Sequence, residues 1–525
     1  MKKFSLVFIF LLSCIVLTAC KGGKNDYSFS LTIDSKNAVR ESIVFEYTLN
    51  DEDGLLAKTD VKGSISKKGS NTIIGTAKTL SMDKNNKGTV TFTGLTAETN
   101  YMVRFYVGYK GKTVELGKYY LKTSAQGTKE TPYEITTKDD FINVMKNDRN
   151  GYYKLMNDID FEGSYVVPVF SSSGGNKFAG EFDGQGYTIK NYVVGTEENP
   201  NKTYGNSNSH VGFFGYIGVD SVIKNVKFDN IQINVYKSAK AYFGIVGGSN
   251  EGSIENVTVT NAKLFVQATT SECYVGGFVG KNSSTGSIKN CSIDAQIKVI
   301  TSGNHVAVGG FVGDNDIPAE LHNQKKENIS NCNFNGSLNY SCTSTSSDEE
   351  RNIWLGGFIG VNRAVVTNCK TTVDITADVK FSDSKVSKYS LYVGGLVGQN
   401  IHDASKLNNL KTTASFNITA KDASKVFIGG LVGLNGLSKD ISSYASISDC
   451  TFTASEKENV ANLYEDKATI FIGLVGFNSG SSKNNTADVE KIITVNYYKL
   501  VEKQEGETVT NVFEQNGIEE FSLDK

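Results

Sequence analysis

Three aspartates are the residues of this 525-residue chain best suited to chemistry. Asp158 and Asp160 flank Ile159, so a strand through them would place both carboxylates on one face, and Asp183 follows in a second polar run. Paired carboxylates hydrolyse glycosidic bonds when they stand about 5 to 10 Å apart. However, Asp183 precedes Gly184 as in an ordinary turn, and the alternation is typical of a plain strand. We therefore favour a structural role for all three.

Other catalytic signatures are missing from the sequence. The H-E-x-x-H zinc motif, the G-x-S-x-G elbow, the phosphate-binding loop and the dinucleotide fingerprint do not occur. The four histidines are not paired at helical spacing, and we expect them to be loop residues rather than ligands: His210, His305, His322 and His402. The sequence predicts no catalytic residue, no metal site and no cofactor.

A nine-residue phrase, Tyr274-Val-Gly-Gly-Phe-Val-Gly-Lys-Asn282, recurs along the chain. It predicts the elements that would position the three aspartates. Clear copies lie at 307–315, 354–362, 392–400 and 427–435, and more divergent copies lie at 212–218, 242–247 and 471–478. Their last glycines are 29 residues apart at the closest, from Gly218 to Gly247, and 47 at the widest, from Gly313 to Gly360. A common core with variable insertions is typical of a solenoid.

A second phrase lies between consecutive copies and carries asparagine at its third position. The row is Asn225, Asn256, Asn290, Asn331, Asn368 and Asn409, closed by Asp449. Asparagine tolerates left-handed backbone angles and bonds nearby amides, so this row predicts a repeated turn. The next residue is cysteine in four copies, Cys291, Cys332, Cys369 and Cys450. Other copies have Val or Leu there, which predicts buried apolar thiols without disulfides, and the lack of C-x-x-C argues against zinc.

Both phrases are strand-like, because they are short, rich in β-branched and aromatic residues, and bounded by Gly, Asn and Ser. A third alternating run follows in most units, as in 293–299, so each unit offers about three strands and three corners. Only stacked units can bury the resulting apolar faces. We predict an all-β chain in which 131–491 form a right-handed parallel β-helix with stacked ladders. Residues 138–147 form a helical plug capped by Asp139, and 492–525 form the opposite cap.

The G-G-[FL]-[VI]-G-x-N phrase resembles the GLUG motif. This motif is a repeat of bacterial surface proteins that also occurs beside the protease domain of some IgA-specific metallo-endopeptidases. The resemblance covers residues 131–498. The resemblance implies a repeat architecture and a cell-surface location. It implies no catalytic residue.

The N-terminus resembles a bacterial lipoprotein signal. Two lysines and an apolar run lead to Leu17-Thr-Ala-Cys20, and the run is too short to span a membrane. The resemblance implies that residues 1–19 are removed and that the thiol of Cys20 carries the lipid, with 20–26 as a tether. We expect export and anchorage in the bacterial membrane, in the outer membrane or at the cell surface.

Residues 27–123 alternate as in an antiparallel sandwich of the immunoglobulin or fibronectin type III kind. The run Leu95-Thr-Ala-Glu-Thr-Asn-Tyr101, which enters a strand, resembles the tyrosine corner of fibronectin type III domains. This resemblance implies a spacer rather than a catalyst. Residues 124–130 are a short polar linker.

Composition limits the function further. The chain has 54 basic and 56 acidic residues, a net charge of −2, and nothing in it indicates nucleic-acid binding. We expect a non-enzymatic, adhesin-like or glycan-binding surface lipoprotein whose partner is a host or cell-surface glycan or protein. Specificity would lie in the insertions at 314–328 and 340–352. The alternative is a polysaccharide-degrading lyase or hydrolase of the pectate-lyase-like β-helix class, with Asp pairs or calcium and a basic residue.

Overall fold

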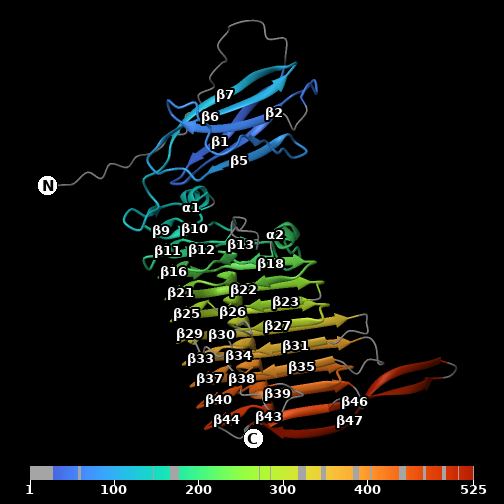
Figure 1. Ribbon diagram of the computed structural model, residues 1–525. Coiled ribbons are helices and arrows are strands. Elements are labelled where there is room, and N and C mark those ends of the chain that lie inside the picture. Colours follow the sequence, from blue (N-terminus) through green and yellow to red (C-terminus); the bar gives the residue numbers. More distant parts are fainter. Residues whose placement is uncertain are drawn as a thin grey trace. The chain divides into compact units, whose positions relative to one another are not determined.

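The protein is described by a computed structural model that divides into two compact units (Figure 1). One unit contains Met1–Ala38 and Ser42–Thr123, and the other contains Val39–Glu41 and Ser124–Lys525. The structure describes residues 28–56, 61–145, 147–165, 177–207, 209–270, 272–283, 285–316, 327–344, 351–381, 389–402, 405–436, 445–464, 469–487, 492–505 and 508–523. The signal at 1–19, the whole tether at 20–26 with Cys20, and His322 lie outside these residues.

The first unit contains two antiparallel sheets. One has the order β1-β2-β5, with β1 Ser30–Ala38, β2 Ser42–Asn50 and β5 Lys87–Thr93. The other has the order β4-β3-β6-β7, with β3 Val61–Lys67, β4 Lys78–Thr79, β6 Asn100–Tyr109 and β7 Lys112–Lys122. Their inward side chains share one hydrophobic cluster, in which the rings of Phe45 and Phe105 meet edge to face at 5.1 Å.

The second unit is built from three large sheets whose strands are mostly parallel. The eleven-stranded sheet carries the second phrase, and we call it the second-phrase sheet. Its strands are β8 Tyr133–Ile135, β9 Tyr152–Leu155, β11 Glu181–Asp183, β16 Val222–Lys224, β21 Ser253–Glu255, β25 Ser287–Lys289, β29 Glu327–Ser330, β33 Val365–Thr367, β37 Lys406–Asn408, β40 Ser446–Ser448 and β44 Ser481–Lys483.

The fifteen-stranded sheet contains the longest strands, and we call it the long-strand sheet. Its main path is β10 Ile159–Asp160, β12 Thr188–Lys190, β17 Lys227–Asp229, β22 Thr258–Ala268, β26 Ser292–Thr301, β30 Asn333–Ser344, β34 Lys370–Phe381, β38 Lys411–Lys421, β42 Val460–Tyr464, β46 Ile492–Glu505 and β47 Thr508–Ser522. Beside this path lie β13 Val193–Val194, β18 Gln232–Lys237, β41 Thr451–Ala454 and β45 Thr486–Ala487.

The fourteen-stranded sheet carries the nine-residue phrase, and we call it the first-phrase sheet. In chain order its strands are β14 His210–Val211, β15 Tyr216–Ile217, β19 Ala241–Phe243, β20 Gly247–Asn250, β23 Glu272–Gly276, β24 Val279–Asn282, β27 His305–Gly309, β28 Val312–Asn315, β31 Arg351–Gly356, β32 Ile359–Asn362, β35 Tyr389–Gly394, β36 Val397–Asn400, β39 Lys425–Asn435 and β43 Thr469–Asn478.

The chain visits the three sheets in turn. For example, β21, β22 and the pair β23–β24 lie in three different sheets, and β25 returns to the first of them. Figure 1 shows the successive rungs stacked on one another. This arrangement is consistent with a parallel β-helix, and we call it the coil. The prediction of a chain that is almost wholly β is confirmed, and the hand of the coil stays a prediction.

Stacked equivalents fill the interior of the coil. The rings of Phe278 and Phe311 lie parallel at 4.7 Å, and those of Phe311 and Phe358 at 4.8 Å. These values match the spacing of hydrogen-bonded strands, about 4.8 Å. All three rings are fully buried, as are Val279 and Val312, which pair in register.

The paired glycines of the first phrase allow a close backbone approach. A Cβ on Gly276 would lie 2.0 Å from the carbonyl oxygen of Val279, and one on Gly277 would lie 2.1 Å from that of Gly310. No side chain fits at such distances. The corner between β23 and β24 therefore requires glycine at both positions.

A helix, α1 (Lys138–Met145), lies near β8, and Met145 is buried in the core of the coil. Its predicted Asp139 cap is wrong. Thr137 Oγ1 accepts the Asp140 N–H at 3.1 Å, and the Asp140 carboxylate accepts the Thr137 N–H at 3.1 Å, which is a capping box. The other helix among the described residues is α2 (Lys202–Ser207). In this part of the chain, no helix has the length and apolar character needed to cross a membrane.

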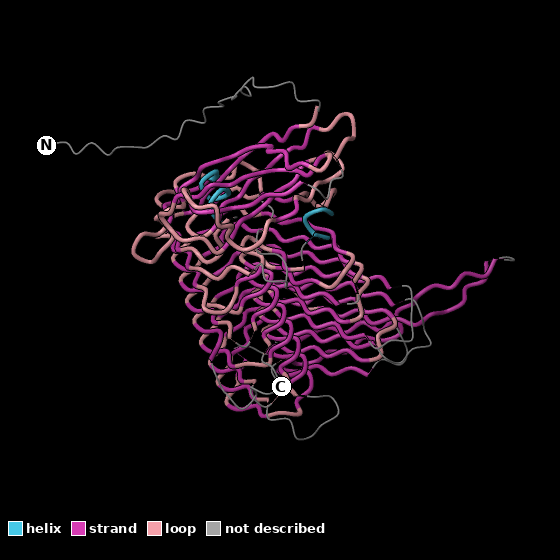
Figure 2. Tube along the Cα trace, turned by 45° about the horizontal axis from the view of Figure 1, so that its top comes forward, coloured by secondary structure: helices cyan, strands magenta, loops and turns pink. Residues whose placement is uncertain are grey.

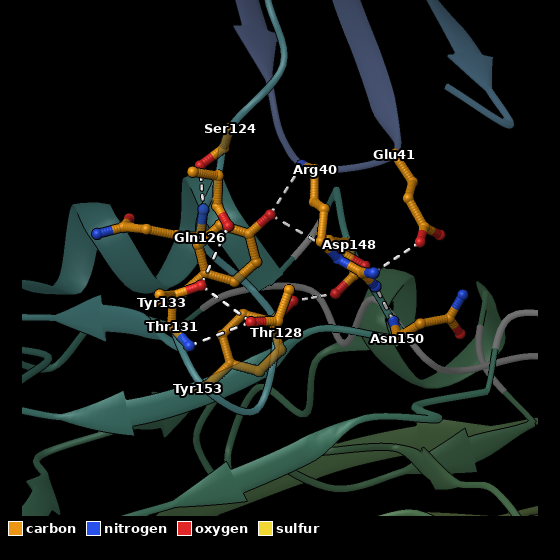
Figure 3. A network of polar contacts seen from close by, with 11 residues as sticks. Arg40, Glu41, Ser124, Gln126, Thr128, Thr131, Tyr133, Asp148, Asn150 and Tyr153 are labelled. Atoms are coloured by element: carbon orange, nitrogen blue, oxygen red, sulfur yellow. Dashed lines mark hydrogen bonds and ion pairs between the residues drawn. The ribbon is translucent and has the colours of Figure 1, made fainter. Parts of the chain in front are cut away.

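A buried polar network lies near α1 (Figure 3). The Tyr133 hydroxyl donates to Asp148 Oδ2 at 3.2 Å and accepts the Arg40 N–H at 2.9 Å, while the Tyr153 hydroxyl donates to the Asp148 carbonyl. Residues 39–41 group with the coil, and Arg40 Nε lies 3.7 Å from Asp148 Oδ2. Burial raises the pKa of Asp148, and the Arg40 charge opposes that rise.

The region expected to form the opposite cap, 492–525, contains strands β46 and β47. Strand β46 pairs in parallel with β42, so residues 494–498 add one more strand to the coil. Strand β47 then returns antiparallel to β46, and the far end of this hairpin extends away from the coil (Figure 2). Leu523, which follows β47, is buried in the core, so the chain does cover core residues at this end.

The two close glycine contacts generate a stability prediction. Gly277→Ala should destabilise the coil by several kcal/mol, since the new methyl meets backbone rather than a movable side chain. Gly517→Ala is the matched control, because its Cβ would meet nothing nearer than 3.5 Å. Urea unfolding followed by circular dichroism measures both variants. Equal midpoints for the two would contradict this account of the corner.

Candidate functional site

The structure places Asp158 and Asp160 beside one shallow hollow of 240 Å³, together with Lys138 and Glu162. Asp158 Oδ1 accepts the Thr188 N–H at 2.8 Å. Asp160 Oδ1 accepts the Asn191 side-chain amide at 2.9 Å and the Glu162 N–H at 2.8 Å, and these hydrogen bonds lower the pKa of Asp160. A carboxylate held in the ionised form serves as a structural acceptor and is a poor general acid.

Asp183 lies on β11 of the second-phrase sheet, whereas Asp160 lies on the long-strand sheet. Asp183 Oδ1 accepts the Asn225 side-chain amide at 3.1 Å and the Gln185 N–H at 3.0 Å, and Lys224 Nζ lies 3.6 Å from Oδ2. None of these contacts involves Asp158 or Asp160. Within the described residues, Asp183 therefore makes no hydrogen bond with the pair that lines the hollow.

Two histidines contradict the expectation of loop positions. His210 lies in β14 and is 6% exposed, and its Nδ1 is 2.8 Å from Ser249 Oγ. Burial lowers the pKa of His210 to about 4, so the imidazole is neutral at physiological pH. His305 begins β27. Each histidine lies two residues before a copy of the nine-residue phrase, at 212–218 or 307–315. The strand therefore begins earlier than the repeat pattern indicated. His402 has a φ of 77° outside any strand, as expected of a turn.

The four cysteines of the second phrase are buried and free. Each Sγ lies close to the carbonyl oxygen two residues earlier, at 3.1 Å for Cys291, Cys332 and Cys369 and 3.3 Å for Cys450. Burial raises the pKa of the Cys291 and Cys369 thiols, and it raises that of Cys450 to about 11. The thiols of Cys291, Cys369 and Cys450 therefore stay protonated, and all four cysteines pack as small buried side chains.

The predicted asparagine row occupies a corner with left-handed backbone. The φ angles are 54° to 56° at Asn225, Asn256, Asn290, Asn331, Asn368, Asn409 and Asp449. Side-chain amides bond from rung to rung, for example Asn256 to Asn225 at 3.1 Å and Asn409 to Asn368 at 2.8 Å. The row therefore forms both the turn and a hydrogen-bonded ladder.

A second asparagine ladder escaped sequence reasoning. Each amide donates to the next amide oxygen at 2.8 to 3.0 Å along Asn250, Asn282, Asn315, Asn362, Asn400, Asn435 and Asn478. The first six are 0% exposed. The available signal was the asparagine that closes all five clear copies of the first phrase. A buried amide fits there because it both donates and accepts.

A polar groove crosses the long-strand sheet and was also missed. Two adjoining hollows of 360 and 350 Å³ share Gln296, Asn335 and Gly336. The register shifts there, because two residues of β22, Thr260 and Asn261, oppose Asp294 alone. Gly336 has a φ of 150°, and a Cβ on it would lie 1.8 Å from the Ala295 carbonyl oxygen. The bulge and this close approach mark the place where the groove lies.

The polar side chains in the middle of this groove are free. Within the described residues, these side chains make no hydrogen bond or ion pair: Gln296, Asn335, Ser337, Thr372 and Thr413. Asp374 differs, since it accepts Ser415 Oγ at 2.5 Å and Lys457 Nζ at 2.6 Å. Partial burial raises the pKa of Asp374, but these hydrogen bonds outweigh it and lower the pKa below its ordinary value.

The insertions expected to carry specificity lie largely outside the described residues, at 317–326 and 345–350. At the base of the first insertion, Asp314 is buried and forms an ion pair with Arg363. Lys281 Nζ lies 2.7 Å from Asp316. These pairs join three rungs and balance one another in charge, so they act as a structural clamp.

The buried thiols generate a prediction. Cys332→Val should leave the free energy of unfolding nearly unchanged, whereas Cys332→Asp should lower it by several kcal/mol, because an unpaired charge would be buried. Asn333→Asp is the matched control, since residue 333 is exposed. Denaturant titration measures all three variants. A disulfide found among the four cysteines by mass spectrometry would contradict the account.

Comparison with known proteins identifies the repeat. The model of the GLUG motif matches residues 271–299. The chain is 34% identical over 140 residues to a "Putative Gly-rich membrane protein" of Evansella cellulosilytica. The aligned region covers 26% of this chain and 15% of that protein. The chain is also 28% identical over 169 residues to "Halomucin" of Haloquadratum walsbyi. That aligned region covers 30% of this chain and 2% of that protein. The chain therefore carries the GLUG repeat and spans a small part of the length of these relatives.

Proposed function

We propose that this protein is a lipid-anchored surface protein that binds an external glycan or protein without altering it chemically. The names of the two relatives, a membrane protein and a halomucin, support a membrane or surface location. The Leu17-Thr-Ala-Cys20 junction supports a lipid on Cys20. In this proposal the coil presents a recognition surface away from the membrane.

The observation that carries the binding function is the polar groove. Free amides and hydroxyls can donate to and accept from a ligand without first breaking an internal hydrogen bond. Elsewhere in the coil, amides such as Asn282 and Asn315 are committed to ladders. The groove is therefore a hollowed part of the described surface that has unused hydrogen-bonding capacity in successive rungs.

The placement of the carboxylates in the groove supports binding over glycosidase chemistry. Its lining carboxylates are Asp294 and Asp374, which lie two rungs apart and two positions along the strand. Their Cα atoms are thus about 12 Å apart, from ~4.8 Å per rung and ~3.3 Å per residue. The carboxyl groups of a catalytic pair stand about 5 to 10 Å apart, so these two side chains would have to lean toward each other to reach that range. Asp374 also bonds Ser415 and Lys457 on the side away from Asp294, so binding without turnover is favoured.

We also propose that the first unit is a fibronectin type III-like sandwich that acts as a spacer. The Tyr101 hydroxyl accepts the Thr96 N–H at 2.7 Å, which is the backbone contact expected of a tyrosine corner. The two antiparallel sheets with one shared core support the same interpretation.

Lipid anchorage is tested by the substitution Cys20→Ala. The variant should stay unprocessed or leave the membrane fraction, because the acylated thiol is the proposed anchor. Cys14→Ala, within the same signal, should be processed and anchored normally. Fractionation and intact-mass measurement follow both variants. Unchanged mass and membrane association in Cys20→Ala would refute the anchor.

The binding function is tested by presenting the soluble mature chain to a panel of glycans and host-matrix proteins. We expect at least one ligand to be retained and recovered intact, since the groove holds no suitably spaced acid and base. Mass spectrometry of the recovered ligand checks for cleavage. A shortened polysaccharide would overturn the non-enzymatic assignment in favour of a lyase or hydrolase.

A further inference from the structure

The residues of the polar groove form two rows that run from rung to rung. In the first row, Asn335 pairs in register with Thr372, and Thr372 pairs with Thr413. The second row is longer and contains Gln232, Lys263, Gln296, Ser337 and Asp374, each in register with the next. Five rungs at ~4.8 Å give a row roughly 19 Å long. A ligand that uses the whole groove must therefore be extended and lie across the strands.

The chemistry of the rows selects among extended ligands. Amides and hydroxyls each donate and accept, which matches a ligand covered in hydroxyl groups. An extended peptide would be recognised by unpaired backbone and by apolar pockets for its side chains. The strands under the groove are already paired on both sides, and the apolar lining residues are only Ala262, Ala295 and Val373, apart from Gly336. A glycan fits this lining better than a peptide.

The charges in and beside the groove cancel. Lys263 and Asp294 carry opposite charges, and Asp374 is neutralised by Lys457 at 2.6 Å. An anionic polysaccharide would need an excess of Lys or Arg to offset its own charge. The groove offers none, so its ligand should be uncharged.

We propose that the polar groove binds an extended, uncharged glycan lying along the axis of the coil, with successive sugar units on successive rungs. The inference rests on the proposed binding function and adds the ligand class, its direction and its length. No lining residue of the two hollows is aromatic, so sugar rings find no stacking platform there. Affinity must accumulate from many modest hydrogen bonds and should rise with glycan length.

The experiment is calorimetric titration of the soluble mature chain with cello-oligosaccharides, from the disaccharide to the hexasaccharide. We expect the association constant to rise with each added sugar. High sodium chloride should change it by less than about two-fold, because the interaction is not ionic. Oligogalacturonates of the same lengths form the anionic arm and should bind more weakly.

Two double variants locate the binding. Gln296→Ala with Asn335→Ala removes free amides shared by both hollows and should lower the association constant of the hexasaccharide roughly five-fold or more. Asn339→Ala with Asn417→Ala is the matched control, because these exposed amides lie on β30 and β38 but do not line the groove. The control should bind as the unmodified chain does. Circular dichroism checks that both variants are folded.

Several results would overturn the inference. Tighter binding of the anionic series, an association constant that does not rise with length, or unchanged binding by the folded groove variant would each do so. If the cello-oligosaccharides fail to bind but another ligand of the panel is retained, this inference falls and the binding function stands. If nothing on the panel is retained, both fall.

Discussion

Parallel stacking in register is the constraint on which the coil depends. Each rung places a side chain directly over its equivalent at the spacing of hydrogen-bonded strands. A residue at a ladder position must therefore be able to stack on, or hydrogen-bond to, the same residue type in the next rung. The rings of Phe278 and Phe311 satisfy this at 4.7 Å by stacking, and the amides of Asn282 and Asn315 satisfy it at 3.0 Å by donating and accepting. A charged or bulky residue at these positions would repel or displace its neighbour.

The same constraint divides the polar residues into two classes. Asparagines at the two corner positions are consumed by their own ladders, so they hold the fold and offer nothing to a ligand. On the outer face of the long-strand sheet, β26 and β30 keep their register, but side chains such as Gln296 and Asn335 do not bond one another. Asn261, in the bulge, and Gly336 both line the same hollow on this face. In the proposed function, architecture and recognition thus use different faces of the same repeat.

The sequence predicted the repeat because its ladders are local patterns of Gly, Asn and apolar residues. It did not predict the groove, because Asn335 and Thr372 become neighbours only when rungs stack with a 37-residue offset set by variable insertions. Asp139 was mistaken for a cap because Thr137 and Asp140 form a reciprocal pair that outcompetes it. His210 was placed in a loop because its partner, Ser249, comes from the next copy. For the groove and for His210 the missing information was a contact between rungs, whereas for Asp139 it was a local contact at the first turn of α1.

The most direct test of the account is a crystal structure of the mature chain with a bound uncharged hexasaccharide. The account predicts glycan density along the axis of the coil, over β22, β26, β30, β34 and β38, with sugar hydroxyls bonded to Gln296, Asn335 and Thr372. The amides of the buried ladder should keep their rung-to-rung bonds. Glycan bound on another face, or lying parallel to the strands, would contradict it.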